Sequence, residues 1–188
     1  MLGAALLLLV AAPVGEPVGV TEGDFETAVG VCDTWLSKPW LWVDHKSSFP
    51  HRSGLDTVGL KQAGGVPSYA RAMAMPGTGN PSFWRLDRGG STFWIITADS
   101  SPVCNIAIGD SGTAAAAAEQ LVMNYHHKPD WTYAGKSGPE AGVLGFSFER
   151  AKAGRVPKTL LTVSAPEKMS PTGDGLQVLA TLNFELEN

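Results

Sequence analysis

The chain has 188 residues, a formal net charge of −4 and 44% hydrophobic residues. This length and apolar content suffice for one domain with a buried core, and the six Trp and seven Phe argue against a disordered chain. The 14 Lys and Arg residues are scattered along the sequence, so we expect no nucleic-acid partner.

The N-terminus carries a short apolar run, MLGAALLLLVAA, followed by prolines and glycines. The run is too short to cross a bilayer as a helix and is typical of a secretory signal, although no Lys or Arg precedes it. We therefore predict a signal peptide and short linker over residues 1–20 and a single domain over residues 21–188. The protein is expected to be secreted or periplasmic and to have no integral membrane span.

Residues 21–38 predict an amphipathic helix. Thr21 and Asp24 have the spacing of a capping box, with Asp in place of the usual Glu or Gln. The apolar residues that recur at helical spacing are Phe25, Val29, Cys32 and Leu36.

Residues 40–81 show no sustained period and hold many glycines and prolines, so we expect a long loop region with a short helix near residues 67–75. Trp40, Trp42 and His45 lie at its start, outside any clear core pattern. Exposed aromatic side chains often contact sugars or partner proteins, so these three residues are candidates for a binding surface. The alternative is that both tryptophans cover the end of the sheet.

Residues 82–99 predict a β-hairpin, because two alternating runs flank Gly89 and Gly90, which tolerate the backbone angles of a two-residue turn. The cross-strand pairs of this register are Arg88–Ser91, Leu86–Phe93, Trp84–Ile95 and Arg85–Trp94. The pairs Leu86–Phe93 and Trp84–Ile95 collect on one face, and the pair Arg85–Trp94 falls on the other.

The rest of the chain adds one helix and several strands. Residues 103–108 alternate and predict a third strand, residues 114–125 predict a second helix, and residues 145–150, 158–163 and 175–187 predict further strands. One-sided alternation is typical of antiparallel sheets that are covered on one face. We therefore predict an α+β fold, with two helices packed on one face of an antiparallel sheet.

The chain has two cysteines, and both fall on predicted core faces. Cys32 lies on the apolar face of the first helix, and Cys104 lies on the apolar face of the third strand. An isolated pair usually bonds in an oxidising compartment, so we predict a disulfide between them.

Residues 109–112, Gly-Asp-Ser-Gly, resemble the nucleophile setting of trypsin-like serine proteases and of GDSL-type esterases. The sequence blocks that carry the histidine in those families have no counterpart in this chain. Asp110 or Ser111 is explained more simply as the N-cap of the second helix, which is our interpretation. The alternative is a small serine hydrolase that uses Ser111 with His126 or His127.

These patterns favour an exported binding or interaction domain over an enzyme. Its expected partner is a protein or carbohydrate of the cell envelope. The spacing of His45, His51 and Asp44 matches no usual set of metal ligands, so we expect neither a metal nor another cofactor.

Overall fold

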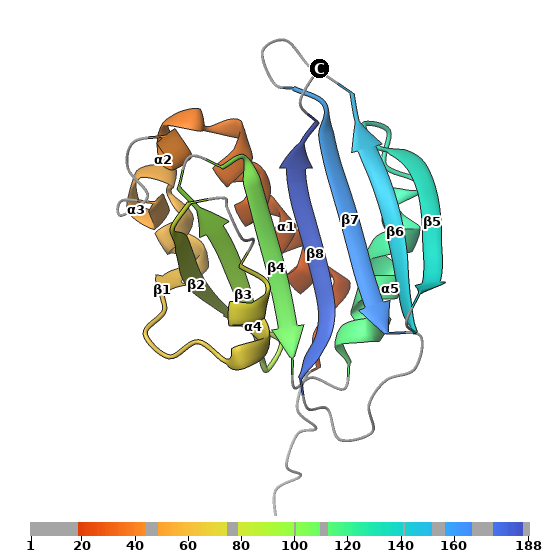
Figure 1. Cartoon of the computed structure of the whole chain (residues 1–188), viewed down its shortest axis with the longest axis horizontal. Coiled ribbons are helices and arrows are strands. Elements are labelled where there is room, and N and C mark those ends of the chain that lie inside the picture. The colour runs from red at the N-terminus through yellow and green to blue at the C-terminus, as the bar shows by residue number, and fades with distance from the viewer. Residues whose placement is uncertain are drawn as a thin grey trace, which may run out of the picture.

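The computed structural model describes residues 19–43, 49–74, 79–99, 101–109, 113–140, 142–151, 157–166 and 175–185. Its centre is an antiparallel sheet of eight strands in the order β1-β2-β3-β4-β8-β7-β6-β5 (Figure 1). In chain order the strands are β1 (Lys61–Gln62), β2 (Pro81–Arg88), β3 (Ser91–Ala98), β4 (Val103–Gly109), β5 (Thr132–Glu140), β6 (Val143–Arg150), β7 (Thr159–Pro166) and β8 (Leu176–Phe184). The predicted α+β class is confirmed, with a larger sheet than expected.

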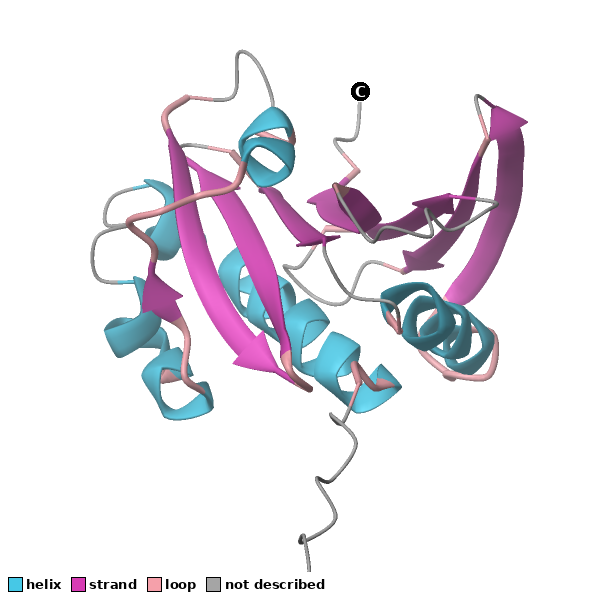
Figure 2. Cartoon of the chain, turned by 90° about the horizontal axis from the view of Figure 1, so that it is seen from below, coloured by secondary structure: helices cyan, strands magenta, loops and turns pink. Residues whose placement is uncertain are grey.

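The helices lie on both sides of this sheet (Figure 2). They are α1 (Glu22–Ser37), α2 (Pro39–Val43), α3 (Phe49–Ser53), the 3-10 helix η2 (Leu55–Val58), α4 (Ser68–Ala72) and α5 (Ala114–Tyr125). The long helix α1 contacts β3, β4, β8 and α5, and α5 contacts β7 and β8. The short helix α4 contacts β4 within a separate hydrophobic cluster, so two helices on one face do not describe the whole fold.

Helix α1 begins with the predicted capping box. The Thr21 hydroxyl accepts a hydrogen bond from the backbone N–H of Asp24 at 3.3 Å, and the Asp24 carboxylate accepts one from the backbone N–H of Thr21 at 2.9 Å. Two of the otherwise unpaired N–H groups at the helix start are thereby satisfied. The buried residues of the helix are Phe25, Ala28, Val29, Val31, Cys32, Trp35 and Leu36.

The β2–β3 hairpin has the predicted register. All four expected pairs are present, and Gly89 and Gly90 turn the chain with φ of 54° and 74°. These positive angles explain why two glycines occupy the turn. Trp84 is buried on the helix-covered face, where its indole N–H donates to the Thr97 hydroxyl at 3.0 Å.

The predicted disulfide between Cys32 and Cys104 is present. It joins α1 to the central strand β4, and the Cα atoms of the two residues are 5.4 Å apart. Both residues are fully buried. The bond therefore fastens the main helix to the middle of the sheet.

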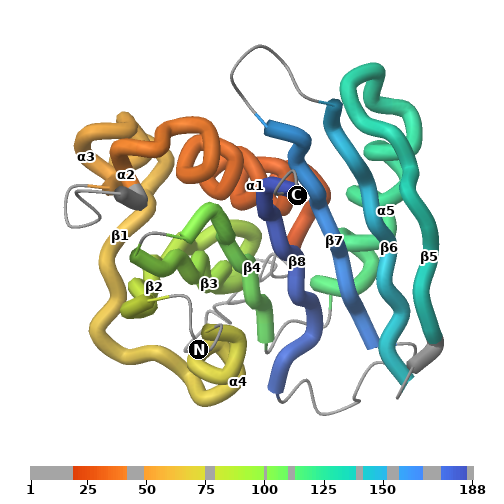
Figure 3. Tube along the Cα trace, turned by 45° about the horizontal axis from the view of Figure 1, so that its top comes forward, coloured from red at the N-terminus to blue at the C-terminus, as the bar shows by residue number. Residues whose placement is uncertain are grey.

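The sheet consists of two halves with the same course. In each half a long helix is followed by a meander that runs from one edge of the sheet to its centre, where β4 pairs with β8. The halves differ between the helix and the meander. In the first half, α2, α3, η2, β1 and α4 lie between α1 and β2 and wrap around the edge of the sheet, whereas residues 126–131 make a short connection in the second half (Figure 3).

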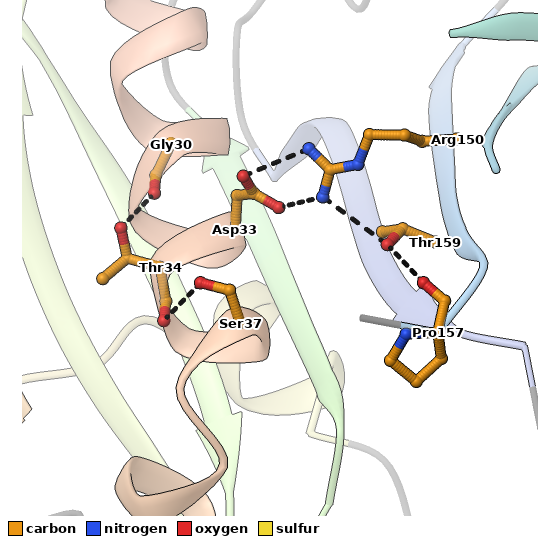
Figure 4. A network of polar contacts seen from close by, with 7 residues as sticks. All are labelled: Gly30, Asp33, Thr34, Ser37, Arg150, Pro157 and Thr159. Carbon is orange, nitrogen blue, oxygen red and sulfur yellow. Dashed lines mark hydrogen bonds and ion pairs between the residues drawn. The ribbon is translucent and has the colours of Figure 1, made fainter. Parts of the chain in front are cut away.

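A line of polar contacts connects α1 to the second half. Asp33 forms a two-point ion pair with Arg150 of β6, and the guanidinium also reaches the Thr159 hydroxyl at 3.5 Å (Figure 4). The hydrogen bonds to Asp33 raise the pKa of Arg150, and its guanidinium lies 4.9 Å from the centre of the Trp131 ring. Two further side-chain pairs on the same side of α1 are Glu22–Asn124 and Glu26–Lys128.

Among the described residues, no helix has the length and apolar character needed to cross a membrane. Residues 1–18, which contain most of the predicted signal segment, lie outside the described part of the chain.

Candidate functional site

The predicted aromatic surface is described only in part. Trp40 belongs to α2 and its side chain is 38% exposed, with the Arg52 guanidinium 5.4 Å from the ring centre. Trp42 lies in the same helix, but its side chain is outside the described residues, as is all of His45. The structure therefore shows one accessible tryptophan at this end of the molecule, and the binding role of the three residues stays a prediction.

The residues of the alternative serine site are not brought together in the described part of the chain. Ser111 lies outside it. Helix α5 starts at Ala114, so Thr113 occupies the N-cap position that we predicted for Asp110 or Ser111. The Thr113 hydroxyl accepts a hydrogen bond from Val20 N–H at 2.7 Å.

The two histidines lie just after the other end of α5. The His126 ring stacks on Tyr133 with ring centres 4.3 Å apart and lies edge-on to Phe148 at 5.4 Å. His127 is exposed. Because an α-helix rises about 1.5 Å per residue, the 12 residues of α5 separate these histidines from Ala114 by roughly 18 Å.

Another surface feature lies on the face of the sheet opposite α1. It consists of two adjoining hollows of about 560 and 360 Å³, which share Gly65 and Trp94. We call them together the outer groove. Its lining residues are Lys61, Gln62, Ala63, Gly64, Gly65, Val66, Pro67, Tyr69, Arg71, Arg85, Asp87, Gly90, Ser91, Thr92, Trp94 and Gly109.

The segment from β1 to α4 forms one wall of the outer groove. Strand β1 pairs with β2 through only two residues, after which the chain turns away at Gly64 and Gly65 and enters α4. Helix α4 is anchored by Ala70, which is fully buried in the cluster containing Trp94. This wall is therefore separated from strands β2 and β3, and the space between them is the outer groove.

Tyr69 closes one end of the outer groove. A Cβ atom on Gly109 would lie 2.6 Å from the Tyr69 ring, so only glycine lets the ring approach the end of β4 this closely. Gly65 behaves differently, because a Cβ atom there would meet nothing within 4 Å. A side chain at position 65 would therefore extend into open space without strain.

The outer groove contains a row of side chains that runs across the strands. Lys61 of β1 is opposite Arg85 of β2, and Arg85 is opposite Trp94 of β3. The sequence predicted the pair Arg85–Trp94, whereas Lys61 joins the row through a two-residue strand that no periodicity revealed.

Asp87 is the one acidic side chain among the described residues that line the outer groove. Its carboxylate accepts hydrogen bonds from Arg85 Nε at 2.7 Å and from the Thr92 hydroxyl at 2.8 Å. Partial burial alone would raise the pKa of Asp87, but these hydrogen bonds and the nearby Lys61 charge outweigh it and hold the pKa below its usual value. Asp87 is therefore ionised at neutral pH.

A separate hollow of about 390 Å³, outside the outer groove, lies between α5 and strands β6 and β7. Its lining is apolar, with Glu119 as its one charged group, and it exists because the alanines of α5 are too small to fill the space. Nothing in the described structure indicates what would occupy it.

The described residues contain no group of three or more His, Cys, Asp or Glu side chains arranged to hold a metal ion. In comparisons with family models, curated proteins and solved structures, no match to this chain was found.

Proposed function

We propose that this protein is an exported binding domain, acting in the periplasm or outside the cell, and that the outer groove holds its ligand. The observation that carries the proposal is the asymmetry between the two halves of the fold. Both halves share a helix and a meander, but in the described structure only the first adds several short elements before its hairpin, and the segment from β1 to α4 among them forms a wall of the outer groove. Segments added to a regular scaffold are where binding residues concentrate.

The disulfide supports the proposed location. Cys32 and Cys104 are bonded and fully buried, which suits an oxidising compartment, whereas cytosolic thiols are kept reduced. The short apolar run at the N-terminus agrees with export.

The composition of the outer groove favours binding over catalysis. No His or Cys is among its described lining residues, and the lowered pKa of Asp87 makes this carboxylate a weak general base. Labelling of Ser111 by a fluorophosphonate probe would contradict this part of the proposal and favour the serine hydrolase.

A fragment screen by NMR tests the site. A library of small organic compounds is added to the ¹⁵N-labelled protein, and binders are expected to shift the amide signals of Gly65, Tyr69 and Trp94. Gly65→Leu should weaken or abolish these shifts, because Gly65 lines both hollows of the outer groove and has room for a larger side chain. Gly30→Leu is the matched control, since Gly30 is exposed on α1 and also has free space around its Cβ position.

Two results would overturn the assignment of the site. One is a set of binders whose shifts map elsewhere on the protein. The other is unchanged binding by the Gly65→Leu variant. The location is tested separately by expressing the full chain in a bacterium, separating the periplasmic and cytoplasmic fractions, and reacting each, after denaturation, with a thiol reagent. A chain retained in the cytoplasm with two reactive thiols would refute export.

A further inference from the structure

We infer that the outer groove binds a small organic anion, with its charged group near Lys61 and Arg85 and its apolar part against Trp94. This inference rests on the proposed function, because it assigns a ligand class to the same groove.

The first argument is charge. The chain as a whole carries a net charge of −4, yet the described lining of the outer groove holds three basic side chains and one acidic one. Lys61 and Arg71 form no ion pair with any residue that the structure describes, and both side chains are exposed. The outer groove is thus locally positive on a negative protein, and such a site attracts anions.

The second argument is the placement of the cations. Lys61 and Arg85 face each other on paired strands, and like charges in directly opposite positions destabilise a sheet. Asp87 offsets part of this repulsion, but its bond to Arg85 engages only Nε. The two terminal nitrogens of the Arg85 guanidinium therefore have no hydrogen-bond partner among the described residues. A carboxylate or phosphate accepts hydrogen bonds from such a pair of nitrogens in parallel.

The third argument is size and the remaining lining. Each hollow lies within the range of pockets that hold small molecules, which is about 300–1,000 Å³. Trp94 supplies apolar surface in the hollow that contains Lys61 and Arg85, and Val66 and Pro67 supply more in the adjoining hollow. An anion with an aromatic or aliphatic body therefore matches the outer groove better than an inorganic ion does.

The test uses matched pairs of probes. Phenylacetate and phenylacetamide have the same shape and differ in charge, and phenyl phosphate offers a second anionic group. We expect both anions to shift the Trp94 indole N–H signal, and we expect the amide to bind at least tenfold more weakly, which corresponds to about 1.4 kcal/mol. Raising the ionic strength should weaken the binding of both anions and leave the affinity for the amide unchanged. The ratio of the two anion affinities distinguishes a carboxylate site from a phosphate site.

Variants of the lining should change affinity in opposite directions. Lys61→Gln and Arg85→Gln should each weaken the binding of phenylacetate roughly five- to tenfold, because each removes a charged donor. Asp87→Asn should strengthen it about twofold or more, because it removes the one negative charge while keeping the side-chain shape. Arg52→Gln is the control, since Arg52 is an exposed cation on α3 outside the outer groove.

The outcomes separate this inference from the proposed function. Equal affinity for phenylacetate and phenylacetamide in the outer groove would refute the inference that the ligand is an anion, but it would not refute the proposed binding site. Weaker binding in Arg52→Gln to the same degree as in Lys61→Gln would also overturn it, because the effect would then be one of total charge. Failure of every fragment to bind the outer groove would overturn both.

Discussion

Removal of the disulfide tests how the two layers of the fold are held together. The bond links residues with a sequence separation of 72, and the chain-entropy model gives such a cross-link about 4 kcal/mol of stabilisation. For a domain of this size, each kcal/mol shifts the melting temperature by about 2–4 °C, so reduction should lower Tm by roughly 8–16 °C. Domains are typically stable by about 5–15 kcal/mol, so the reduced protein is expected to remain folded with a small margin.

Urea unfolding of three samples separates the contributions of the cross-link and of packing. The oxidised and reduced wild-type proteins differ only in the bond, whereas Cys32→Ala/Cys104→Ala also deletes two sulfur atoms from the core. We expect the first step to account for most of the loss. The urea m value should rise on reduction, because an unfolded chain without the bond is more expanded. A loss below about 1 kcal/mol on reduction, or an unchanged m value, would refute the reasoning.

Two further predictions concern α1. Gly30→Ala should stabilise the protein by about 0.5–1 kcal/mol in chemical denaturation, because Gly30 is exposed in the helix interior and a Cβ atom there meets no neighbour; destabilisation would contradict this. A double-mutant cycle with Asp33→Asn and Arg150→Met should give a coupling energy of about 1 kcal/mol, since the side chains are 36% and 23% exposed. The more exposed pair Arg85–Asp87 should give less in the same assay, and equal values would argue against a role of burial.

The elements that the sequence predicted well are those whose side chains follow one strong period. Helix α1 and the β2–β3 hairpin each bury a continuous apolar face, so periodicity and turn residues agreed on their positions. Both cysteines fell on such faces, which is why their pairing could be inferred before any contact was known.

Strand β5 was missed for the opposite reason. Gly135, Gly138 and Pro139 disfavour a strand, and the strand lies at the sheet edge with its register interrupted at two points. Strand β5 is held in the sheet by its pairing with β6, and its own sequence carries little sign of a strand.

The outer groove could not be predicted because it depends on contacts between short elements. The two residues of β1 and the five of α4 are too few to show a period, and their positions are set by packing on β2, β3 and β4. The sequence did place Arg85 and Trp94 on the same side of the sheet. The pattern did not indicate that Lys61 comes from outside the hairpin to lie opposite Arg85, or that Arg71 lines the adjoining hollow.

The meeting of the two halves at β4 and β8 has a consequence for the order of folding. The β2–β3 hairpin pairs residues that are near each other in the sequence. Ile106 and Ala180 in the central pair of strands are about 70 residues apart, so their contact forms much more slowly. During synthesis the first half is therefore complete while the edge of β4 still lacks its partner. An unpaired edge in the middle of a sheet is a template for strands of other chains, so aggregation of a newly made chain is expected to start at β4.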